Sequence, residues 1–381
     1  MSEDVYKRLA AHLDDLPGGF PPTETGVELR ILRRLFTPKE AEMALHLALI
    51  PEEAKVIAHR ARRSVEETTS LLDEMFQKGL ISKLKKKEGP SVYMALQYVI
   101  GIWEYHVNAV DKGLAKDMEE YIPYLLDFDV WKKTPQLRTI PVGQSIDHQL
   151  EIMPYEEAEE LVKNQSKCLV APCICRQEQS LLGKGCDRPE ESCLVFGRGA
   201  MIYEDRGIGR VIDNAEALEI LRKADEAGLV LQPSNSKDIV NICCCCGCCC
   251  GILRTLKAHP KPSAIVSSPF VCSAEEEKCI GCGVCVHRCP MDALELQSDK
   301  VVLNTDRCIG CGLCVSTCLG DALSLKRKPE SEQKKVPETF RSAMINLAQE
   351  RGKLKPSSAA KMVLRSKRDR LRTRNQSYKQ K

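Results

Sequence analysis

Eight cysteines toward the C-terminal end of the chain repeat one spacing twice. Residues 279–290 read CIGCGVCVHRCP and residues 308–319 read CIGCGLCVSTCL, so both segments follow C-x2-C-x2-C-x3-C. Cysteine thiolates bind iron in iron–sulfur clusters and zinc in structural sites. Structural zinc takes four thiolates from two C-x2-C pairs with a longer spacer between them, and it does not need four cysteines in eleven residues. The spacing therefore favours iron–sulfur chemistry.

The repeat resembles the bacterial two-cluster ferredoxin family over about residues 273–325. The resemblance implies two [4Fe-4S] clusters with crossed ligation, in which the last cysteine of each repeat binds the other cluster. The implied ligands of cluster one are Cys279, Cys282, Cys285 and Cys318. The implied ligands of cluster two are Cys308, Cys311, Cys314 and Cys289. Pro290 follows the first repeat but Leu319 follows the second, which departs from the family pattern without removing a ligand.

Thirteen of the 21 cysteines remain, and most of them lie in two segments. Five fall between Cys168 and Cys193, seven form the run CCCCGCCC over residues 243–250, and Cys272 stands apart. A buried apolar role explains one or two cysteines but not seven in eight residues, because Val or Leu fills a core without the risk of oxidation. The metal ligands expected here are Cys173, Cys175, Cys186, Cys193, Cys243, Cys244, Cys245, Cys246, Cys248, Cys249 and Cys250.

Three kinds of site fit these middle cysteines. One or two additional iron–sulfur clusters would use the first segment alone or together with the 243–250 run. A zinc site at Cys173-Cys175 is a structural alternative. The triplets Cys245-Cys246-Gly247 and Cys249-Cys250-Gly251 resemble the CCG motifs of heterodisulfide-reductase-type subunits, whose noncubane clusters perform disulfide chemistry. Because successive side chains of an extended segment point to opposite sides, one site cannot collect all seven, and we expect three or four metal centres per chain.

The fold class predicted around these cysteines is α+β. Residues 1–26 are expected to form a leading helix and linker, followed by a winged helix-turn-helix-like domain over 27–130. A cysteine-rich α+β domain follows over 131–272, a dicluster ferredoxin-like β-α-β domain over 273–325, and a basic tail over 326–381. A run such as this tail is usually solvated and disordered, apart from a helix expected around Phe340 to Glu350. Alternatively, the basic tail would anchor the protein to an acidic redox partner, to nucleic acid or to anionic lipid.

The winged-helix prediction depends on local helix and turn signals. Thr37 with Glu40 forms a capping box before one helix, Pro51 is expected to open the next, and Ser64 begins the last, which stops at Gly79. A hairpin then turns at Glu88-Gly89-Pro90.

DNA binding by this domain is disfavoured because the last helix carries acidic side chains that would repel phosphate. The acidic residues are Glu66, Glu67, Asp73 and Glu74. Basic residues on the wing act in the opposite direction: Lys83, Lys85, Lys86 and Lys87. A protein-docking or dimerising module is the other interpretation.

Charge and hydropathy bound the location and partners. The formal net charge is +3, but residues 326–381 hold 18 Lys and Arg against 5 Asp and Glu, which leaves an acidic body of net −10 before them. The N-terminal residues MSEDVYKRLAAHLDDL are polar, and the longest near-apolar run, residues 92–103, falls short of the roughly 20 residues that a membrane helix needs. A cytoplasmic protein without a transmembrane segment is therefore expected. Because the cytoplasm is reducing, clustered thiols there are expected to bind metal rather than form disulfides.

The whole arrangement is similar to cytoplasmic 4Fe-4S proteins of anaerobic bacteria. The similarity is specific for cluster binding. From the two ferredoxin-type clusters we expect an electron-transfer protein or oxidoreductase subunit that relays single electrons between donor and acceptor redox proteins, with a homo-oligomer left open. Alternatives are a redox-sensing iron–sulfur transcription regulator that uses the winged helix, and a CCG-type disulfide or thiol redox enzyme subunit. No nucleotide-binding glycine loop or Ser/His/Asp set is legible, so catalytic residues are not assigned.

Overall fold

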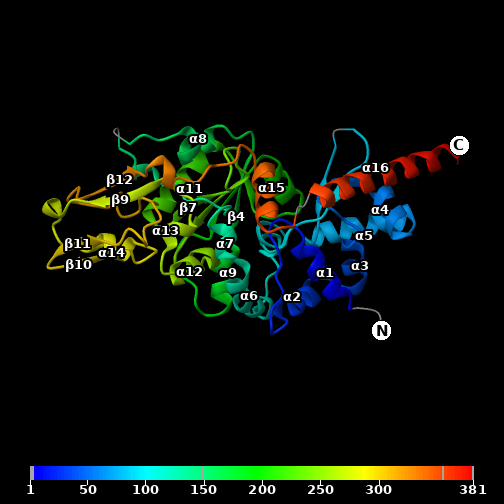
Figure 1. Ribbon diagram of the computed structural model, residues 1–381, viewed down its shortest axis with the longest axis horizontal. Coiled ribbons are helices and arrows are strands. Elements are labelled where there is room, and N and C mark those ends of the chain that lie inside the picture. The colour runs from blue at the N-terminus through cyan, green and yellow to red at the C-terminus, as the bar shows by residue number, and fades with distance from the viewer. Residues whose placement is uncertain (1–3, 87, 148–149, 354–355, 380–381) are drawn as a thin grey trace. The chain divides into compact units, whose positions relative to one another are not determined.

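The computed structural model describes residues 4–86, 88–147, 150–353 and 356–379, and Figure 1 labels its helices and strands. The chain forms two compact units, one from residues 1–125 and 348–381 and the other from residues 126–347. Within the described ranges, no helix is both long enough and apolar enough to cross a bilayer.

The first unit is mainly helical and contains one small antiparallel sheet. Its helices are α1 (Val5–Asp14), α2 (Val27–Leu35), α3 (Pro38–Ala44), α4 (Ala54–Ala61), α5 (Val65–Lys78), α6 (Lys112–Leu125) and α16 (Pro356–Lys379), with the short turns η1 (Tyr98–Ile102) and η2 (Glu104–His106). The strands β1 (Glu52–Glu53), β2 (Ser82–Leu84) and β3 (Val92–Met94) pair in the order β1-β3-β2. The order helix, strand, two helices and hairpin runs from α3 to β3, and the winged-helix assignment of this segment stays a prediction.

The helix boundaries in this unit follow the expected caps. The Thr37 side chain accepts from the Glu40 backbone N–H, and the Glu40 carboxylate accepts from the Thr37 N–H at 2.8 Å, which confirms the capping box. The Ser64 hydroxyl caps α5 by accepting from the Glu67 N–H. Gly79 ends α5 in the left-handed conformation, with φ of 85°.

The start of α4 differs from the expectation that Pro51 opens the helix. Glu52 and Glu53 form strand β1, which pairs with β3 through Glu52 and Tyr93, and α4 begins only at Ala54. The buried Glu52 carboxylate pairs with the Arg60 guanidinium at 2.8 Å. Sheet pairing and this buried ion pair therefore hold residues 52–53 extended.

The basic tail is largely helical. The expected helix near Phe340 is confirmed as α15 (Phe340–Glu350). Residues from 348 onward belong to the first unit, where α16 packs on α4 and Asp369 pairs with Arg60 at 3.1 Å. The described part of α16 thus covers a helix of its own chain.

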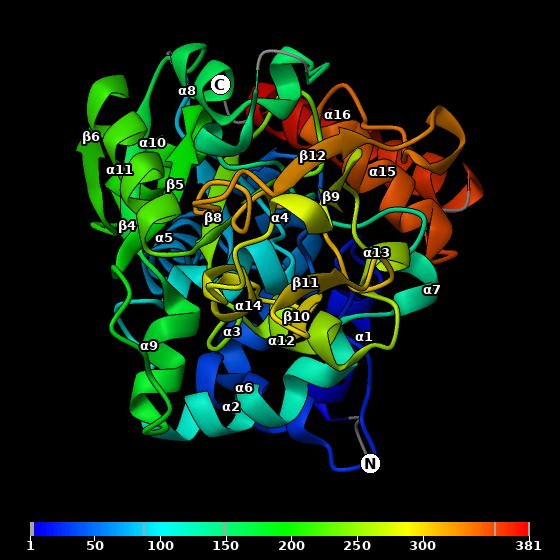
Figure 2. The ribbon, with the colours of Figure 1, turned by 90° about the vertical axis from the view of Figure 1, so that its left-hand side faces the viewer.

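The second unit contains a five-stranded antiparallel sheet of order β6-β4-β5-β8-β7. Its strands are β4 (Cys168–Pro172), β5 (Glu191–Phe196), β6 (Arg210–Ile212), β7 (Val230–Pro233) and β8 (Asn241–Cys245). Its helices before residue 270 are α7 (Phe128–Trp131), η3 (Gly143–Ser145), η4 (Pro154–Glu156), α8 (Ala158–Lys163), α9 (Ile174–Leu181), α10 (Gly197–Asp205), α11 (Asn214–Glu226), α12 (Gly251–Ala258) and α13 (Pro262–Ile265). Helices α10 and α11 pack against β4 and β5 (Figure 2).

Two antiparallel ribbons carry the repeated cysteine segments. Strand β9 (Phe270–Ala274) pairs with β12 (Leu323–Arg327), and β10 (Leu294–Gln297) pairs with β11 (Lys300–Leu303). The short helix α14 (Val284–Arg288) packs beside β10, as Figure 1 shows, and η5 (Glu276–Lys278) and η6 (Glu330–Glu332) complete the region. The β9–β12 pairing begins at residue 270 and ends at 327, slightly beyond the expected limits of 273 and 325, and it brings Cys272 into this region.

Candidate metal centres

The first cysteine-lined cavity draws thiols from both repeats. Cys279, Cys282 and Cys285 come from the first repeat and Cys318 comes from the second. The backbone N–H of Val301 donates to Cys279 Sγ at 3.3 Å, and the N–H of Ala322 donates to Cys318 Sγ at 3.3 Å. The rest of the lining is mainly aliphatic.

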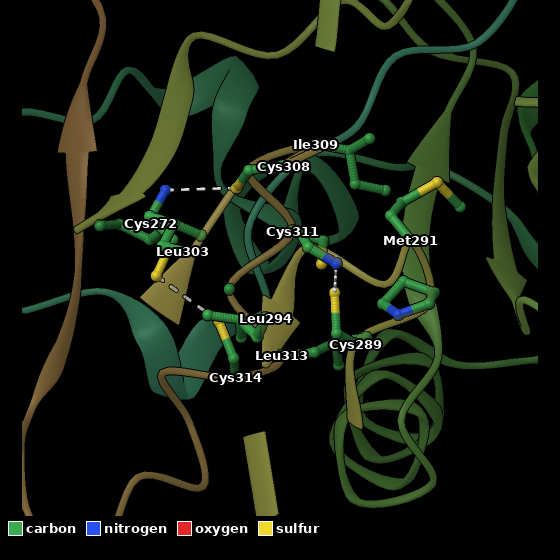
Figure 3. A pocket seen from close by; sticks show the side chains of 15 residues that line it. Cys272, Cys289, Met291, Leu294, Leu303, Cys308, Ile309, Cys311, Leu313 and Cys314 are labelled. Atoms are coloured by element: carbon green, nitrogen blue, oxygen red, sulfur yellow. Dashed lines mark hydrogen bonds between the residues drawn. The ribbon is translucent and has the colours of Figure 1, made fainter. Parts of the chain in front are cut away.

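The second cavity has the reciprocal composition (Figure 3). Its lining includes Cys308, Cys311 and Cys314 from the second repeat and Cys289 from the first, and Leu294, Leu303 and Leu313 surround them. The N–H of Cys272 donates to Cys308 Sγ at 3.4 Å, and the N–H of Ala293 donates to Cys289 Sγ at 3.3 Å. In each repeat, therefore, the first cysteine sulfur accepts a hydrogen bond from a strand N–H. The last cysteine sulfur accepts one from the N–H of the residue four positions after it.

Two glycines allow the cysteine loops to approach the strands closely. Gly281 and Gly310 adopt φ values of 72° and 69°, a region that favours glycine. A Cβ on Gly281 would lie 2.7 Å from the Asp299 carbonyl oxygen, and a Cβ on Gly310 would collide with the Phe270 carbonyl oxygen. Larger side chains at these positions would push the loops away from the β10–β11 turn and from strand β9.

The residues of both cavities fit an iron–sulfur cluster. Four thiols converge on each cavity, backbone N–H groups point at sulfur, and most of the remaining lining is aliphatic. Burial raises the pKa of Cys285 to about 11 and raises the pKa of Cys311 well above its usual value. Without metal these thiols hold their protons, so cluster binding must displace protons.

Comparison with known proteins supports the same chemistry. Residues 278–322 match the family described as the 4Fe-4S dicluster domain. The chain is therefore supported as an iron–sulfur protein with at least one [4Fe-4S] cluster. No curated protein and no solved structure matches the chain. The dicluster domain contains all eight cysteines of the repeat.

A four-cysteine group forms outside the dicluster domain. The sulfurs of Cys186, Cys246, Cys248 and Cys249 all lie within 4.8 Å of one another. Cys186 Sγ lies 3.9 Å from Cys246 Sγ and 3.6 Å from Cys249 Sγ. Arg188 secures the Cys186 loop by donating to Cys248 Sγ at 3.5 Å and to the Ala227 carbonyl at 2.9 Å. Four sulfurs in this arrangement can bind a metal ion or a cluster.

Six other middle cysteines contact one another through their thiols, and they are placed around the end of β8. They are Cys173, Cys175, Cys193, Cys243, Cys245 and Cys250. The two Cys-Cys-Gly triplets divide between the groups, because Cys246 and Cys249 lie in the four-cysteine group while Cys245 and Cys250 lie in the six-cysteine group. The alternation of side chains in the sequence predicted that the 243–250 run would be divided between sites. It did not predict which cysteines would join which group.

Two cysteines lie outside both middle groups. Cys244 alternates with Cys243 and Cys245 along β8 and so faces the other side of the strand. Burial raises the pKa of the Cys244 thiol to about 12, which keeps it protonated. Cys244 belongs to neither group of thiols, and its role as a metal ligand stays a prediction. Cys168 donates to the Asn214 side-chain oxygen at 3.2 Å, and burial raises its pKa as well.

Two residues beside the cysteine sites were not among the site residues predicted from the sequence. Cys272 lines the second cavity, and its sulfur lies 3.7 Å from that of Cys314. Arg176 is 2% exposed and lies beside both middle cysteine groups. Its position directly after Cys175 in the segment PCICR was the available signal, because an arginine among clustered thiols can neutralise their charge.

Proposed function

We propose that this protein transfers single electrons through two [4Fe-4S] clusters in the dicluster domain. Cluster one is bound by Cys279, Cys282, Cys285 and Cys318. Cluster two is bound by Cys308, Cys311, Cys314 and Cys289. The observation that carries the proposal is that each cavity collects three thiols from one repeat and one from the other. When bound, the clusters would supply one-electron chemistry, and the cysteine thiolates of the chain would hold and orient them.

The two cluster sites differ in their exposure to solvent, and this difference indicates at which site a redox partner docks. Near cluster one, Cys282 is exposed, and the apolar side chains of Ile280 and Leu319 are 64% and 77% exposed. Near cluster two, Cys308 and Cys311 are each only 8% exposed. A redox partner protein therefore docks at cluster one, where an apolar contact surface surrounds the ligands.

Cluster two faces the cysteine-rich part of the second unit. A Cβ on Gly247 would lie 3.0 Å from the carbonyl oxygen of Pro290, the residue after Cys289. Gly247 lies between Cys246 and Cys248, so the four-cysteine group is close to a ligand of cluster two. The four-cysteine group therefore serves as a third centre that exchanges electrons with cluster two.

The first unit is proposed as a protein-docking or dimerising module. Lys83 on the wing donates to Asp73 at 2.6 Å, and Lys86 donates to Glu53 at 3.0 Å, so acids of the same unit occupy these cations. Lys87 lies outside the described residues. Because these lysines are already paired with carboxylates, they are less available to bind DNA phosphates. The ion pairs therefore disfavour the DNA-binding regulator relative to the electron-transfer protein.

Anaerobic spectroscopy of the full chain tests this function. Stepwise reduction should give paramagnetic signals from two interacting [4Fe-4S] clusters, and small one-electron acceptors should reoxidise them. Cys282→Ala should remove the signal of one cluster and Cys311→Ala that of the other. The control Cys168→Ala should change neither, because that thiol bonds Asn214 away from the sulfur groups. Colourless, iron-free protein that carries zinc alone would overturn the proposal.

A further inference from the structure

The six middle cysteines form a continuous series of sulfur contacts. Cys193 contacts Cys243, which contacts Cys245, and Cys245 contacts Cys250. The series continues from Cys250 to Cys175 and ends at Cys173. None of the 21 cysteines, all of which are described, forms a disulfide.

Sheet register and helix starts bring these six thiols together. Cys193 on β5 is the cross-strand partner of Cys243 on β8, and Cys245 lies two residues further on the same face. Cys173 is the N-cap residue of α9, and Cys250 is the N-cap residue of α12. The Cys250 side chain therefore stands at the start of α12, beside the backbone of its first turn.

Arg176 contributes a buried positive charge beside the six cysteines. Its guanidinium donates to the Pro189 and Cys244 carbonyl oxygens, each at 2.8 Å, and to the Ser192 hydroxyl. These contacts hold the cation where it interacts with Cys173 and Cys245 of the six-cysteine group, and with Cys246 of the four-cysteine group. A buried guanidinium is stabilised by nearby negative charge, which metal-bound thiolates of these groups would supply.

We propose that these six cysteines hold one iron–sulfur centre that is distinct from the centre at Cys186, Cys246, Cys248 and Cys249. The inference rests on the proposed electron-transfer function, which it extends by a fourth centre. One cubane or one zinc ion uses four thiolates, so either would leave two clustered thiols without metal. A centre with more than four thiolate ligands uses the whole group, and the bridging sulfides belong to the cluster.

The position of the centre suits the end of an electron relay. Cys245-Cys246 and Cys249-Cys250 are adjacent pairs, and each pair contributes one thiol to each middle group. The six-cysteine centre is thus joined to the four-cysteine centre by two single peptide links. The four-cysteine centre in turn lies beside cluster two through Gly247 and Pro290.

Three matched variants of the full chain test the separation. Cys173→Ala removes a thiol from the six-cysteine group and Cys248→Ala removes one from the four-cysteine group. Cys168→Ala is the control, because this thiol is not among the expected ligands and donates a hydrogen bond to the Asn214 side chain. Iron, zinc and acid-labile sulfide are counted on anaerobic protein, and Mössbauer and paramagnetic-resonance spectra identify the components.

The expected result is a separate loss for each group. The parent should carry more than the roughly eight iron atoms of two cubanes, and Cys173→Ala should lose on the order of four of them. Cys248→Ala should lose a different spectral component, and Cys168→Ala should match the parent. If Cys173→Ala and Cys248→Ala both lost the same spectral component, the inference would be overturned. It would also be overturned if Cys173→Ala lost zinc and not iron relative to the parent.

The metal content of the parent decides the matter even if a variant does not fold. Parent protein whose iron all resides in the two dicluster signals would overturn the further centre but leave the proposed function intact. Absence of the two dicluster signals, scored with Cys311→Ala, would instead overturn the proposed function. The two failures are therefore distinguishable.

Discussion

The guanidinium of Arg288 donates a hydrogen bond to the carboxylate of Asp225 at 2.8 Å, and little of either side chain is exposed. Ser316 also donates to this carboxylate at 2.8 Å. Arg288 precedes Cys289 and Ser316 lies two residues before Cys318, so one acid of α11 holds both cysteine repeats. Burial raises the pKa of Asp225, and its charged form depends on these two donors.

Asp225→Ala should destabilise the second unit strongly. Removal of one partner from a buried ion pair costs about 3–5 kcal/mol in the free energy of unfolding. Asp306→Ala is the control, since its pair with Lys261 at 2.7 Å is exposed and should contribute about 0–1 kcal/mol. Denaturant unfolding followed by Trp131 fluorescence in a Trp103→Phe background measures the difference, and equal effects would contradict the buried role.

Crossed ligation predicts which cysteine variants resemble each other. Cys318→Ala should perturb the same cluster signal as Cys282→Ala, because both thiols line the first cavity. Cys289→Ala should instead resemble Cys311→Ala. Paramagnetic-resonance spectra of the reduced proteins measure this, and pairing of Cys318→Ala with Cys311→Ala would refute the assignment.

Cys272 should tune cluster two without binding it. When Cys314 binds iron as a thiolate it can only accept, so the Cys272 thiol becomes the donor across their 3.7 Å separation. Loss of that donor in Cys272→Ala should lower the cluster-two potential by on the order of 20–60 mV, if the bond contributes about 0.5–1.5 kcal/mol. Redox titration measures the shift. Unchanged potential, or loss of iron, would exclude this role.

The C-terminal helix should stabilise the first unit. Asp369 is 5% exposed and pairs with Arg60, so Asp369→Ala should cost about 1–3 kcal/mol in the free energy of unfolding. Lys367→Ala is the neighbouring control and should change stability by less than about 0.5 kcal/mol, because the Lys367 side chain is exposed. Unfolding is followed by Trp103 fluorescence in a Trp131→Phe background. A solvated tail would show no effect from either change.

Stability of the first unit should depend on pH through His12. Burial lowers the pKa of His12 below its ordinary 6.5, so the unfolded chain takes up a proton that the folded unit does not. The free energy of unfolding should therefore fall as pH decreases through about 6.5. His12→Gln should reduce this slope in the Trp131→Phe background. Burial also lowers the pKa of His46, which leaves part of the slope in the variant.

Short-range features were readable in the sequence because they depend on neighbours within a few residues. The capping box at Thr37, the stop at Gly79 and the helix at Phe340 follow from local hydrogen bonds and backbone preferences. The dicluster domain was equally readable, because its loops wrap three thiols over seven residues and repeat the pattern.

Long-range placement required the folded chain, because it depends on pairing between distant segments. Strand β1 replaced an expected helix start because β3 lies beside it. Cys272 reached the second cavity through the β9–β12 pairing, and the seven cysteines of residues 243–250 divided according to β8 register and the start of α12. Composition and spacing specify the kind of ligand, whereas sheet register and burial specify which thiols meet.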